Sequence, residues 1–401
     1  MNNDELQVLG IERKSNKHNR WMVTALMLIA IAVGIGLFAL LSSNQTEKVK
    51  TGKKIGDPTI VPELQEAVDS FLLEEMEKDG ATQGQTIVMD VQTGEILAMV
   101  GQERNFEKKY QPCKNFAYQQ EMGSLMKTAS LLAALETGKV KLSDEVNVGV
   151  GIHAINSSLV MRDHNWHRGG YGLITVCKAL MVSSNIGISK AVDKAFGKNQ
   201  QQFFDLLDKM SYGQPDSIEG ITGLKPTIYT SPKDSNWVSS NLWWSAIGYD
   251  RKIAPIQMLT FYNAIANDGK MVKPTLKTGV VEIINPQIAS KASIDSMQVA
   301  LENVVSQGLG KRAGTQMLFV AGKTGTAEVE EYYYDENPVT EYQLAFCGYF
   351  PADKPKYSMI VSINKLGLPA SGGLMAGQVF HNIVEWMAVH NFIKGIKPSR
   401  R

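Results

Sequence analysis

Strand-like runs occur early and late in the chain, with a long stretch of other sequence between them, and this arrangement limits the folds that the chain can adopt. Residues 85–100, QTIVMDVQTGEILAMV, alternate apolar and polar side chains around a QTG sequence, which is typical of two strands joined by a tight turn. Three more strand-like runs come late, at residues 316–328, 342–350 and 357–364. Since all five runs must bury a face, we expect one antiparallel sheet built from the early and the late runs together.

Helical periodicity flanks and separates these strands. Residues 62–80 have the spacing of an amphipathic helix that ends near Gly80, and residues 375–392 predict a helix after the last strand. The helix-like runs between the early and late strands lie at residues 121–138, 175–183, 186–196, 200–210, 255–267 and 293–307. The sequence therefore predicts an α/β (α+β) fold, with a five-stranded antiparallel sheet flanked by helices and an all-helical insert.

An apolar run near the start predicts a membrane anchor. Residues 21–41 carry no charge and, at about 1.5 Å per residue in a helix, cover roughly 30 Å, enough to span a bilayer. A cleaved signal peptide is the alternative. We expect a cytoplasmic tail, an uncleaved transmembrane anchor, a tether and one large domain on the far side of the membrane, at residues 1–20, 21–41, 42–60 and 61–401.

Composition and charge narrow the classes of function. With 44% hydrophobic and 20% charged residues, the chain can bury a large core and is not disordered. A net charge of +1, without a basic stretch that contains aromatic residues, gives no support for nucleic-acid binding. Three cysteines are too few and too widely spaced for a zinc site. We expect free thiols, and a Cys113–Cys347 disulfide is the open alternative.

A serine three residues before a lysine, at the start of a helix, points to nucleophilic chemistry. Ser124 precedes a run of good helix formers, and Gly138 supplies a left-handed stop. Positions i and i+3 share a helix face, so the Lys127 amine can reach the Ser124 hydroxyl. About two such pairs are expected by chance, and the second pair, Ser362 and Lys365, lies in a strand-like run where these side chains point to opposite faces.

Two further motifs can complete a site around Ser124, because attack on a carbonyl needs a base, a proton donor and an oxyanion hole. The sequence SSN at residues 183–185 lies between two helical patterns, and KTGT at residues 323–326 lies in a strand-like run. Each motif alone has little weight. Ser-x-Asn recurs at residues 42, 239 and 362, and Lys-Thr-Gly recurs at residues 50 and 277. Ser239 is the most plausible rival to Ser183.

Six stretches, in order, carry a resemblance to a known family. They are IVMDVQTGEILAMV, EMGSLMK, GLITVCKALMVSSNIGISK, IAPIQMLTFYNAIANDGKMVKP, VAGKTGTAE and LAFCGYFPADKPKYSMIVSI. Together they resemble the transpeptidase domain of class B penicillin-binding proteins over residues 85–378, and the match selects Ser183 and Lys323. Met122 stands where the family usually has proline, and the interval before the domain is too short for the family's usual N-terminal pedestal region.

The resemblance implies a serine D,D-transpeptidase that cross-links peptidoglycan stem peptides ending in D-Ala-D-Ala and is acylated by β-lactams. Ser124 would be the nucleophile. Lys127 would be its base, with a pKa lowered by the nearby charge of Lys323. Ser183 would pass a proton to the leaving amine, and Asn185 would hold the substrate peptide.

The remaining motif residues are implied in substrate binding. Lys323, Thr324, Gly325 and Thr326 would hold the terminal carboxylate, and the backbone N–H groups of Ser124 and Thr326 would form the oxyanion hole. No metal or cofactor is required. The family also implies a bacterial cytoplasmic membrane location with the domain outside, and a partner that polymerises glycan strands.

Two other functions stay open at this stage. A β-lactamase or carboxypeptidase would need a carboxylate that activates water, and Glu219 in a loop is the residue to consider, although such a residue is more often only solvated. A membrane-bound β-lactam sensor would be acylated by β-lactams without turning over any peptide.

The cluster of Asp163, His164 and His167 lies in a glycine-rich loop without a fourth ligand, so we do not predict a metal site there.

Overall fold

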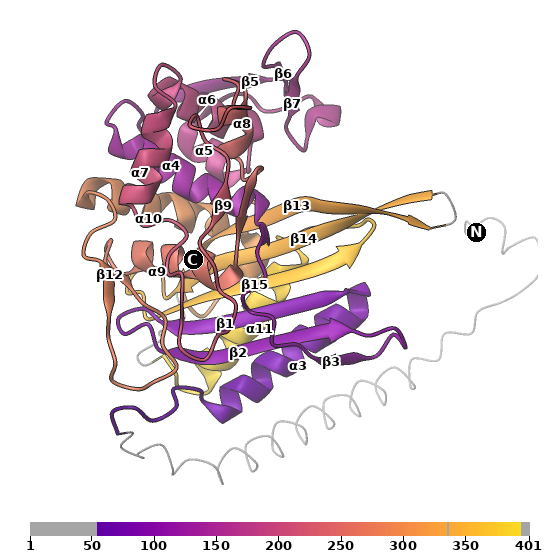
Figure 1. Ribbon diagram of the computed structural model, residues 1–401, viewed down its shortest axis with the longest axis vertical. Coiled ribbons are helices and arrows are strands. Elements are labelled where there is room, and N and C mark those ends of the chain that lie inside the picture. The colour runs from indigo at the N-terminus through magenta and orange to yellow at the C-terminus, as the bar shows by residue number, and fades with distance from the viewer. Residues whose placement is uncertain (1–53, 335–336, 394–401) are drawn as a thin grey trace, which may run out of the picture. The chain divides into compact units, whose positions relative to one another are not determined.

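The computed structural model describes residues 54–334 and 337–393, in which a six-stranded antiparallel sheet forms the centre (Figure 1). Its order is β13-β14-β15-β1-β2-β3. The strands are β1 (Gln83–Asp90), β2 (Ile96–Arg104), β3 (Tyr110–Pro112), β13 (Ala321–Tyr334), β14 (Asn337–Phe350) and β15 (Tyr357–Leu366). The predicted sheet of early and late strands is confirmed, but the predicted number of five strands is wrong. The sixth strand, β3, has only three residues, too few to show an alternating pattern.

The two halves of the sheet join where β1 pairs with β15. The register runs from Gln83 opposite Asn364 to Asp90 opposite Tyr357. Both strands are buried along nearly their whole length, so the sheet is covered on both faces. Along β1, Ile87 and Met89 belong to one apolar core and Val88 to the other, as the alternation of a strand requires.

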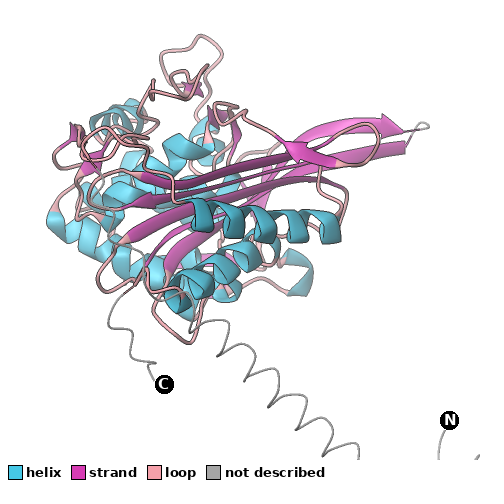
Figure 2. Ribbon diagram, turned by 90° about the horizontal axis from the view of Figure 1, so that it is seen from below, coloured by secondary structure: helices cyan, strands magenta, loops and turns pink. Residues whose placement is uncertain are grey.

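Two helices cover one face of the sheet. They are α3 (Pro62–Asp79) and α11 (Met375–Val389), which pack against each other and against the strands (Figure 2). Both were predicted from their periodicity. Gly80 ends α3 with a φ of 64°, a left-handed conformation that glycine adopts without strain.

The insert covers the other face and contributes most of the larger apolar core. Its helices are α4 (Met126–Glu136), α5 (Val176–Met181), α6 (Asn185–Phe196), α7 (Gln201–Lys209), α8 (Asn241–Ser245), α9 (Pro255–Ala266) and α10 (Lys291–Ser306). Every residue of α9 is buried, and Pro255 stands in its first turn, where a missing N–H does no harm.

The prediction that the insert is all-helical is wrong. It contains short antiparallel pairings: β4 (Gln120–Glu121) and β9 (Ile228–Tyr229) with β10 (Arg251–Ile253), β5 (Glu145–Gly149) with β8 (Gly172–Thr175), β6 (Ile152–Ala154) with β7 (Val160–Arg162), and β11 (Met271–Val272) with β12 (Ile283–Asn285). Strands of two to five residues are shorter than the runs in which alternation becomes visible.

The predicted tail, anchor and most of the tether, in residues 1–53, lie outside the described residues. Within the described ranges, no helix is both long and apolar enough to cross a bilayer. Cys113, Cys177 and Cys347 are free thiols, so the expectation of free cysteines is confirmed.

Candidate active site

Ser124 lies where the insert meets the sheet. A short 3-10 turn, η1 (Gly123–Leu125), leads directly into α4, so the predicted position at a helix start is confirmed. Gly123 has a φ of +49°, and a Cβ there would lie 2.5 Å from the Thr326 carbonyl oxygen. Because only glycine fits this approach, η1 can pack directly on β13, and the half-buried Ser124 faces a cleft.

Lys127 lies one turn further along and is completely buried. Its Nζ donates to the Ser183 carbonyl oxygen at 2.7 Å, to Ser183 Oγ at 3.2 Å and to Asn185 Oδ1 at 2.6 Å. Among the described residues, no hydrogen bond joins Lys127 Nζ to Ser124 Oγ. Catalytic hydrogen bonds often tighten only when substrate binds, so the geometry is compatible with a base beside its nucleophile.

The SSN segment turns sharply between α5 and α6. Ser183 has a φ of +54°, which is uncommon for a residue other than glycine and aims its side chain into the cleft. Ser184 caps α6, because its Oγ accepts the Gly187 N–H at 2.9 Å. The turn thus places Ser183 and Asn185 on one wall of the cleft.

Asp163 holds this turn in place, a role that the sequence did not reveal. Its carboxylate accepts a hydrogen bond from Ser184 Oγ at 2.6 Å and from the Ile186 N–H at 3.0 Å, and its side chain is 1% exposed. In the sequence, Asp163 stands out only as a neighbour of His164 and His167, and within the described part of the chain no group of His, Cys, Asp or Glu is arranged to hold a metal ion. A helix N-terminus also favours the negative charge.

Lys323 reaches the same point from the sheet. It is completely buried in β13, and its Nζ donates to Ser183 Oγ at 2.9 Å and to the Thr324 carbonyl oxygen at 2.9 Å. Ser183 Oγ therefore accepts from both lysines. Next along β13, a Cβ at Gly325 would lie 2.9 Å from Leu125 Cγ, and Thr326 is exposed with Oγ1 accepting the Gly372 N–H at 3.2 Å.

Burial changes the protonation of both lysines. Loss of solvent lowers the pKa of Lys127 to about 7, and the negative charge of Asp163 opposes this change. Burial also holds the pKa of Lys323 well below its usual range, and the charge of Lys127 lowers it further. The expectation that the charge of Lys323 lowers the pKa of Lys127 is therefore wrong: desolvation lowers it, and between the two amines it is the charge of Lys127 that lowers the pKa of Lys323. Lys127 is suited to accept a proton near neutral pH.

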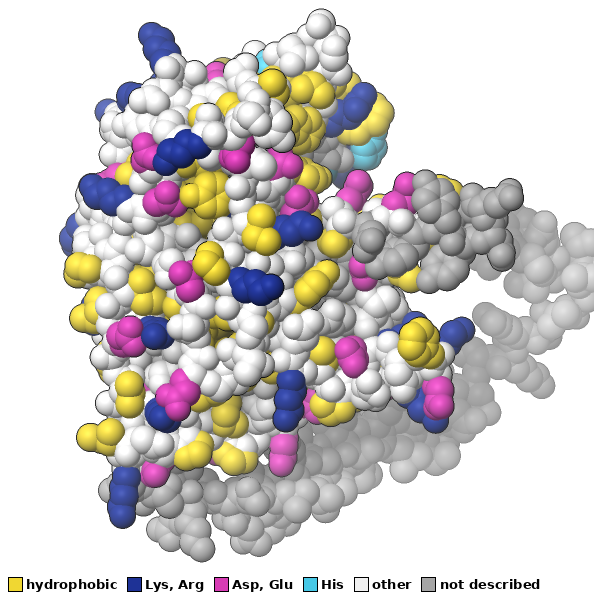
Figure 3. Space-filling view, viewed as in Figure 1, with side chains coloured by type: hydrophobic (Ala, Val, Ile, Leu, Met, Phe, Trp, Pro, Cys, Tyr) yellow, Lys and Arg dark blue, Asp and Glu magenta, His cyan; other side chains and the backbone are white. Residues whose placement is uncertain are grey.

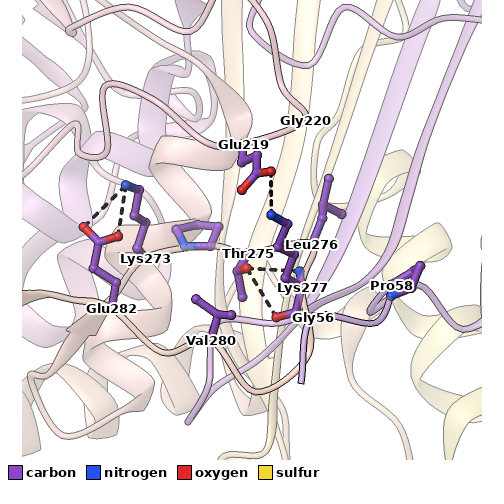
Figure 4. Close-up of a pocket in the computed structure, with 11 residues that line it drawn as sticks. Gly56, Pro58, Glu219, Gly220, Lys273, Thr275, Leu276, Lys277, Val280 and Glu282 are labelled. Atoms are coloured by element: carbon purple, nitrogen blue, oxygen red, sulfur yellow. Dashed lines mark hydrogen bonds and ion pairs between the residues drawn. The ribbon is translucent and has the colours of Figure 1, made fainter. Parts of the chain in front are cut away.

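The competing motifs lie elsewhere. Ser362 is buried in β15, where its Oγ accepts from Gln120 Nε2 and Gln343 Nε2. Ser239 is exposed in a loop and is absent from the cleft lining. Lys277 pairs with Glu219 at 2.7 Å beside a separate hollow that also contains Lys273 and Gly56 (Figure 4). Since Glu219 does not line the cleft of Ser124, it cannot activate water there.

The cleft has a volume of about 660 Å³ and gathers the predicted residues. Those that line it are Ser124, Ser183, Asn185, Thr324 and Thr326, while Lys127 and Lys323 lie buried against them. Its rim contains residues that the sequence did not single out. They are Arg162, Trp166, Arg168, Tyr249, Glu328 and Tyr342. No local motif marks these residues, because the cleft brings the segment of residues 162–168 together with residues far away in the sequence.

This arrangement can perform acyl transfer. A half-buried hydroxyl lies at a helix start beside a buried amine with a pKa of about 7, and a second hydroxyl bridges two amines. The exposed edge of β13 next to Ser124 offers backbone and hydroxyl groups to an extended ligand.

Comparisons with known proteins agree with this chemistry. Residues 84–385 match the family described as penicillin binding protein transpeptidase domain. Stage V sporulation protein D of Bacillus subtilis is 28% identical over 74% of this chain and 48% of its own length. The probable peptidoglycan D,D-transpeptidase PbpC of Pseudomonas aeruginosa is 27% identical over 77% of this chain and 54% of its own. The chain thus spans about half the length of these relatives.

A solved structure shows the same fold. The transpeptidase domain of penicillin-binding protein 3 from Burkholderia pseudomallei superposes with a TM-score of 0.71 and 25% identity, covering 86% of this chain and 98% of that one. Fold, motif order and site geometry therefore lead to one conclusion: the chain belongs to the penicillin-binding protein transpeptidase domain family, as a class B member.

Proposed function

We propose that this protein is a serine D,D-transpeptidase that cross-links peptidoglycan stem peptides and is acylated by β-lactams. The observation that carries the proposal is the position of Ser183 Oγ, which accepts hydrogen bonds from Lys127 and Lys323 at 3.2 and 2.9 Å. Three motifs that are separate in the sequence thereby form one proton-transfer network beside Ser124. Relatives named as peptidoglycan D,D-transpeptidases support the choice of substrate.

In the acylation step, Ser124 Oγ attacks the carbonyl carbon between the two D-alanines. Neutral Lys127 accepts the hydroxyl proton, and the backbone N–H groups of Ser124 and Thr326 stabilise the oxyanion. Collapse of the tetrahedral intermediate breaks the C–N bond. Ser183 passes its hydroxyl proton to the departing amine and takes one from protonated Lys127, to which it is hydrogen-bonded. Free D-alanine leaves, and the rest of the donor stays on Ser124 as an ester.

In the second step an amine of another stem peptide attacks this ester and forms the amide bond of the cross-link. The ester C–O bond breaks, and the proton lost by the amine passes through the same network to Ser124 Oγ, which restores its hydroxyl. Asn185 can hold the donor, because its Oδ1 binds Lys127 while its amide group keeps one N–H beyond the bond to the Arg162 carbonyl oxygen. During acylation, the carboxylate of the terminal D-alanine is bound by Lys323, Thr324 and Thr326. Gly325 lets the donor approach β13 closely.

A labelled penicillin tests the proposal. When the nucleophile opens the β-lactam ring, the amine stays attached to the acyl group, so the label remains on the protein. Intact-mass measurement should show one adduct per chain, and peptide mapping should place it on Ser124. The Ser124→Ala variant should form no adduct while melting near the parent temperature, because one hydroxyl at a helix start contributes about 1 kcal/mol. An adduct on Ser239 or Ser362, or none at all, would refute the assignment.

Turnover separates transpeptidation from the two alternatives. A transpeptidase releases D-alanine and joins the donor to an amine acceptor. A carboxypeptidase or β-lactamase would instead release the acyl group to water, and a sensor would form the penicillin adduct without consuming any D-Ala-D-Ala peptide. Measuring D-alanine release and cross-linked product together distinguishes all three.

We also propose that residues 21–41 anchor the domain in the bacterial cytoplasmic membrane with the cleft outside, and that a glycan-polymerising enzyme works beside it. The uncharged run and the substrate's location outside the cell support this placement. To test this, a reporter enzyme that works only outside the cytoplasm can be fused after Arg401. We expect the fusion to show reporter activity. Labelling of a cysteine introduced at Thr51 from the cytoplasm would contradict the orientation.

A further inference from the structure

Two arginines lie on the cleft wall that carries Ser183 and Asn185. Arg162 ends β7, and Arg168 ends a short turn, η2 (Trp166–Arg168); both are exposed and line the cleft. The guanidinium of Arg162 lies 5.6 Å from the centre of the Trp166 ring. Stacking on an aromatic face orders a guanidinium while leaving its in-plane N–H groups available for a ligand.

Within residues 54–334 and 337–393, neither guanidinium has an anionic partner, and neither forms an ion pair or a hydrogen bond. The adjacent carboxylate of Asp163 is turned inward to Ser184 and Ile186 and is buried. Two positive charges therefore face the cleft while the nearest acid is committed to the protein interior.

The opposite wall has the opposite charge. Glu328 is exposed two residues beyond Thr326 on β13, on the same face of the strand, and it lines the cleft without pairing with either arginine. In Figure 3, the hollow between the region of β6 and β7 and the β13–β14 hairpin has basic and histidine side chains above it and acidic ones below. A ligand lying in the cleft therefore meets positive charge on the Asn185 side.

The donor peptide passes this positive wall. Asn185 Nδ2 donates to the Arg162 carbonyl oxygen at 2.8 Å, so the residue that holds the donor and the first arginine are directly joined. The part of the donor that precedes D-Ala-D-Ala must continue past Asn185 along the cleft. Arg168 follows within the same segment, near His164, which also lines the cleft; burial lowers the pKa of His164, and the charges of Lys127 and Arg168 lower it further.

We propose that Arg162 and Arg168 form a subsite for a carboxylate that the donor carries within the two residues before D-Ala-D-Ala. The subsite rests on the transpeptidase function proposed above and adds a substrate preference to it. A guanidinium binds a carboxylate with two parallel hydrogen bonds, which a neutral amide cannot reproduce. Donors with a free carboxylate should therefore react faster than donors in which it is amidated.

The test compares two synthetic donors that differ at one group. Both are N-acetylated peptides ending in D-Ala-D-Ala, one with a free carboxylate at the stated position and the other with the primary amide there. D-alanine release by the full-length chain in detergent should be about tenfold faster with the free carboxylate, the effect of one partly exposed charge-assisted contact. This preference should decrease as salt is added, since exposed charges are screened.

Variants assign the preference to the two arginines. The double variant Arg162→Gln/Arg168→Gln should bring the ratio of the two rates close to one. Arg104→Gln removes an exposed arginine at the end of β2, away from the cleft, and should leave the ratio unchanged. Glu328→Gln removes the opposite charge and should keep the ratio or raise it.

The outcomes separate the subsite from the transpeptidase function. Equal rates for the two donors with the parent protein, or an unchanged ratio in the double variant, would overturn the subsite while penicillin labelling and D-alanine release still support the enzyme. If neither donor releases D-alanine and Ser124 is not labelled, the proposed function fails and the subsite fails with it. If the double variant does not fold, the test is the salt dependence of the ratio of the two rates with the parent protein. A ratio that does not decrease as salt is added would overturn the subsite.

Discussion

The rate of penicillin acylation should rise with pH through a midpoint near 7, because Lys127 must be neutral to accept the Ser124 proton. Lys127 is completely buried, and burial lowers its pKa to about 7. An exposed lysine, which titrates near pH 10.4, would give a rate that still increases well above pH 8. The position of the midpoint therefore reports the environment of this one amine.

The size of the effect follows from the pKa. A base with a pKa of about 7 is roughly one tenth neutral at pH 6 and nine tenths neutral at pH 8, so the acylation rate should rise about tenfold between them. Asp163 favours the charged form of Lys127. The Asp163→Asn variant should therefore lower the pKa of Lys127, move the midpoint to lower pH and bring the ratio of the two rates closer to one.

The measurement is the second-order acylation rate with a fluorescent penicillin, followed by rapid quenching between about pH 5 and 9. Asp163 also accepts hydrogen bonds from Ser184 and Ile186, so its replacement should cost about 1–3 kcal/mol, and a melting curve at each pH shows that the variant is folded. His164→Asn is the matched control. It removes another titratable side chain of the cleft, whose pKa burial lowers, and should leave the midpoint near 7.

Two results would refute this account of Lys127. A rate that is flat between about pH 6 and 8 would show that its deprotonation does not limit acylation. A midpoint that moves in His164→Asn and stays in place in Asp163→Asn would assign the titration to the histidine.

Three further substitutions test the site. Lys127→Arg should acylate at least about 100-fold more slowly at pH 8, because a guanidinium stays protonated; a rate within a few-fold of the parent would make Lys127 structural. Asn185→Ala should keep the melting temperature within a few degrees and slow acylation about tenfold or more, since it removes the 2.6 Å bond to Lys127. Gly123→Ala should lower the free energy of unfolding by about 1–3 kcal/mol and slow labelling of Ser124, because its Cβ would meet the Thr326 carbonyl oxygen; an unchanged melting curve would contradict the close packing.

Long periodic segments made most of the fold predictable. The hairpin of β1 and β2, the three late strands and the helices α3, α9, α10 and α11 each extend over enough residues to show alternation or a helical repeat. Their order along the chain requires the first strands to meet the last ones, which β1 and β15 do. The short pairings of the insert have no such signal, because packing against the helices, and not local sequence, fixes them.

The reacting residues of the site could be predicted from the sequence, but the residues that hold them in place and the burial that sets their pKa values could not. Ser124, Lys127 and Lys323 stand in short motifs whose spacing carries chemical meaning. Asp163 has no motif of its own, and its function depends on a contact with Ser184, 21 positions away in the sequence. The dominant cause of the low pKa of Lys127 was also missed, since burial is a property of the packed core that no local pattern displays.

The packing of the insert on the sheet and the reactivity of Ser124 depend on the same contacts. Lys127 belongs to α4 and Lys323 to β13, and each is fully buried only because η1 lies directly on the sheet. Glycines at positions 123 and 325 permit that approach, as a Cβ at either position would lie 3.0 Å or less from atoms of the other layer. A looser interface would admit water, restore the usual pKa of both amines and leave Lys127 protonated at neutral pH. Close packing between the two layers is therefore what supplies the catalytic base, and substitutions at this interface should change the pH dependence of acylation before they unfold the domain.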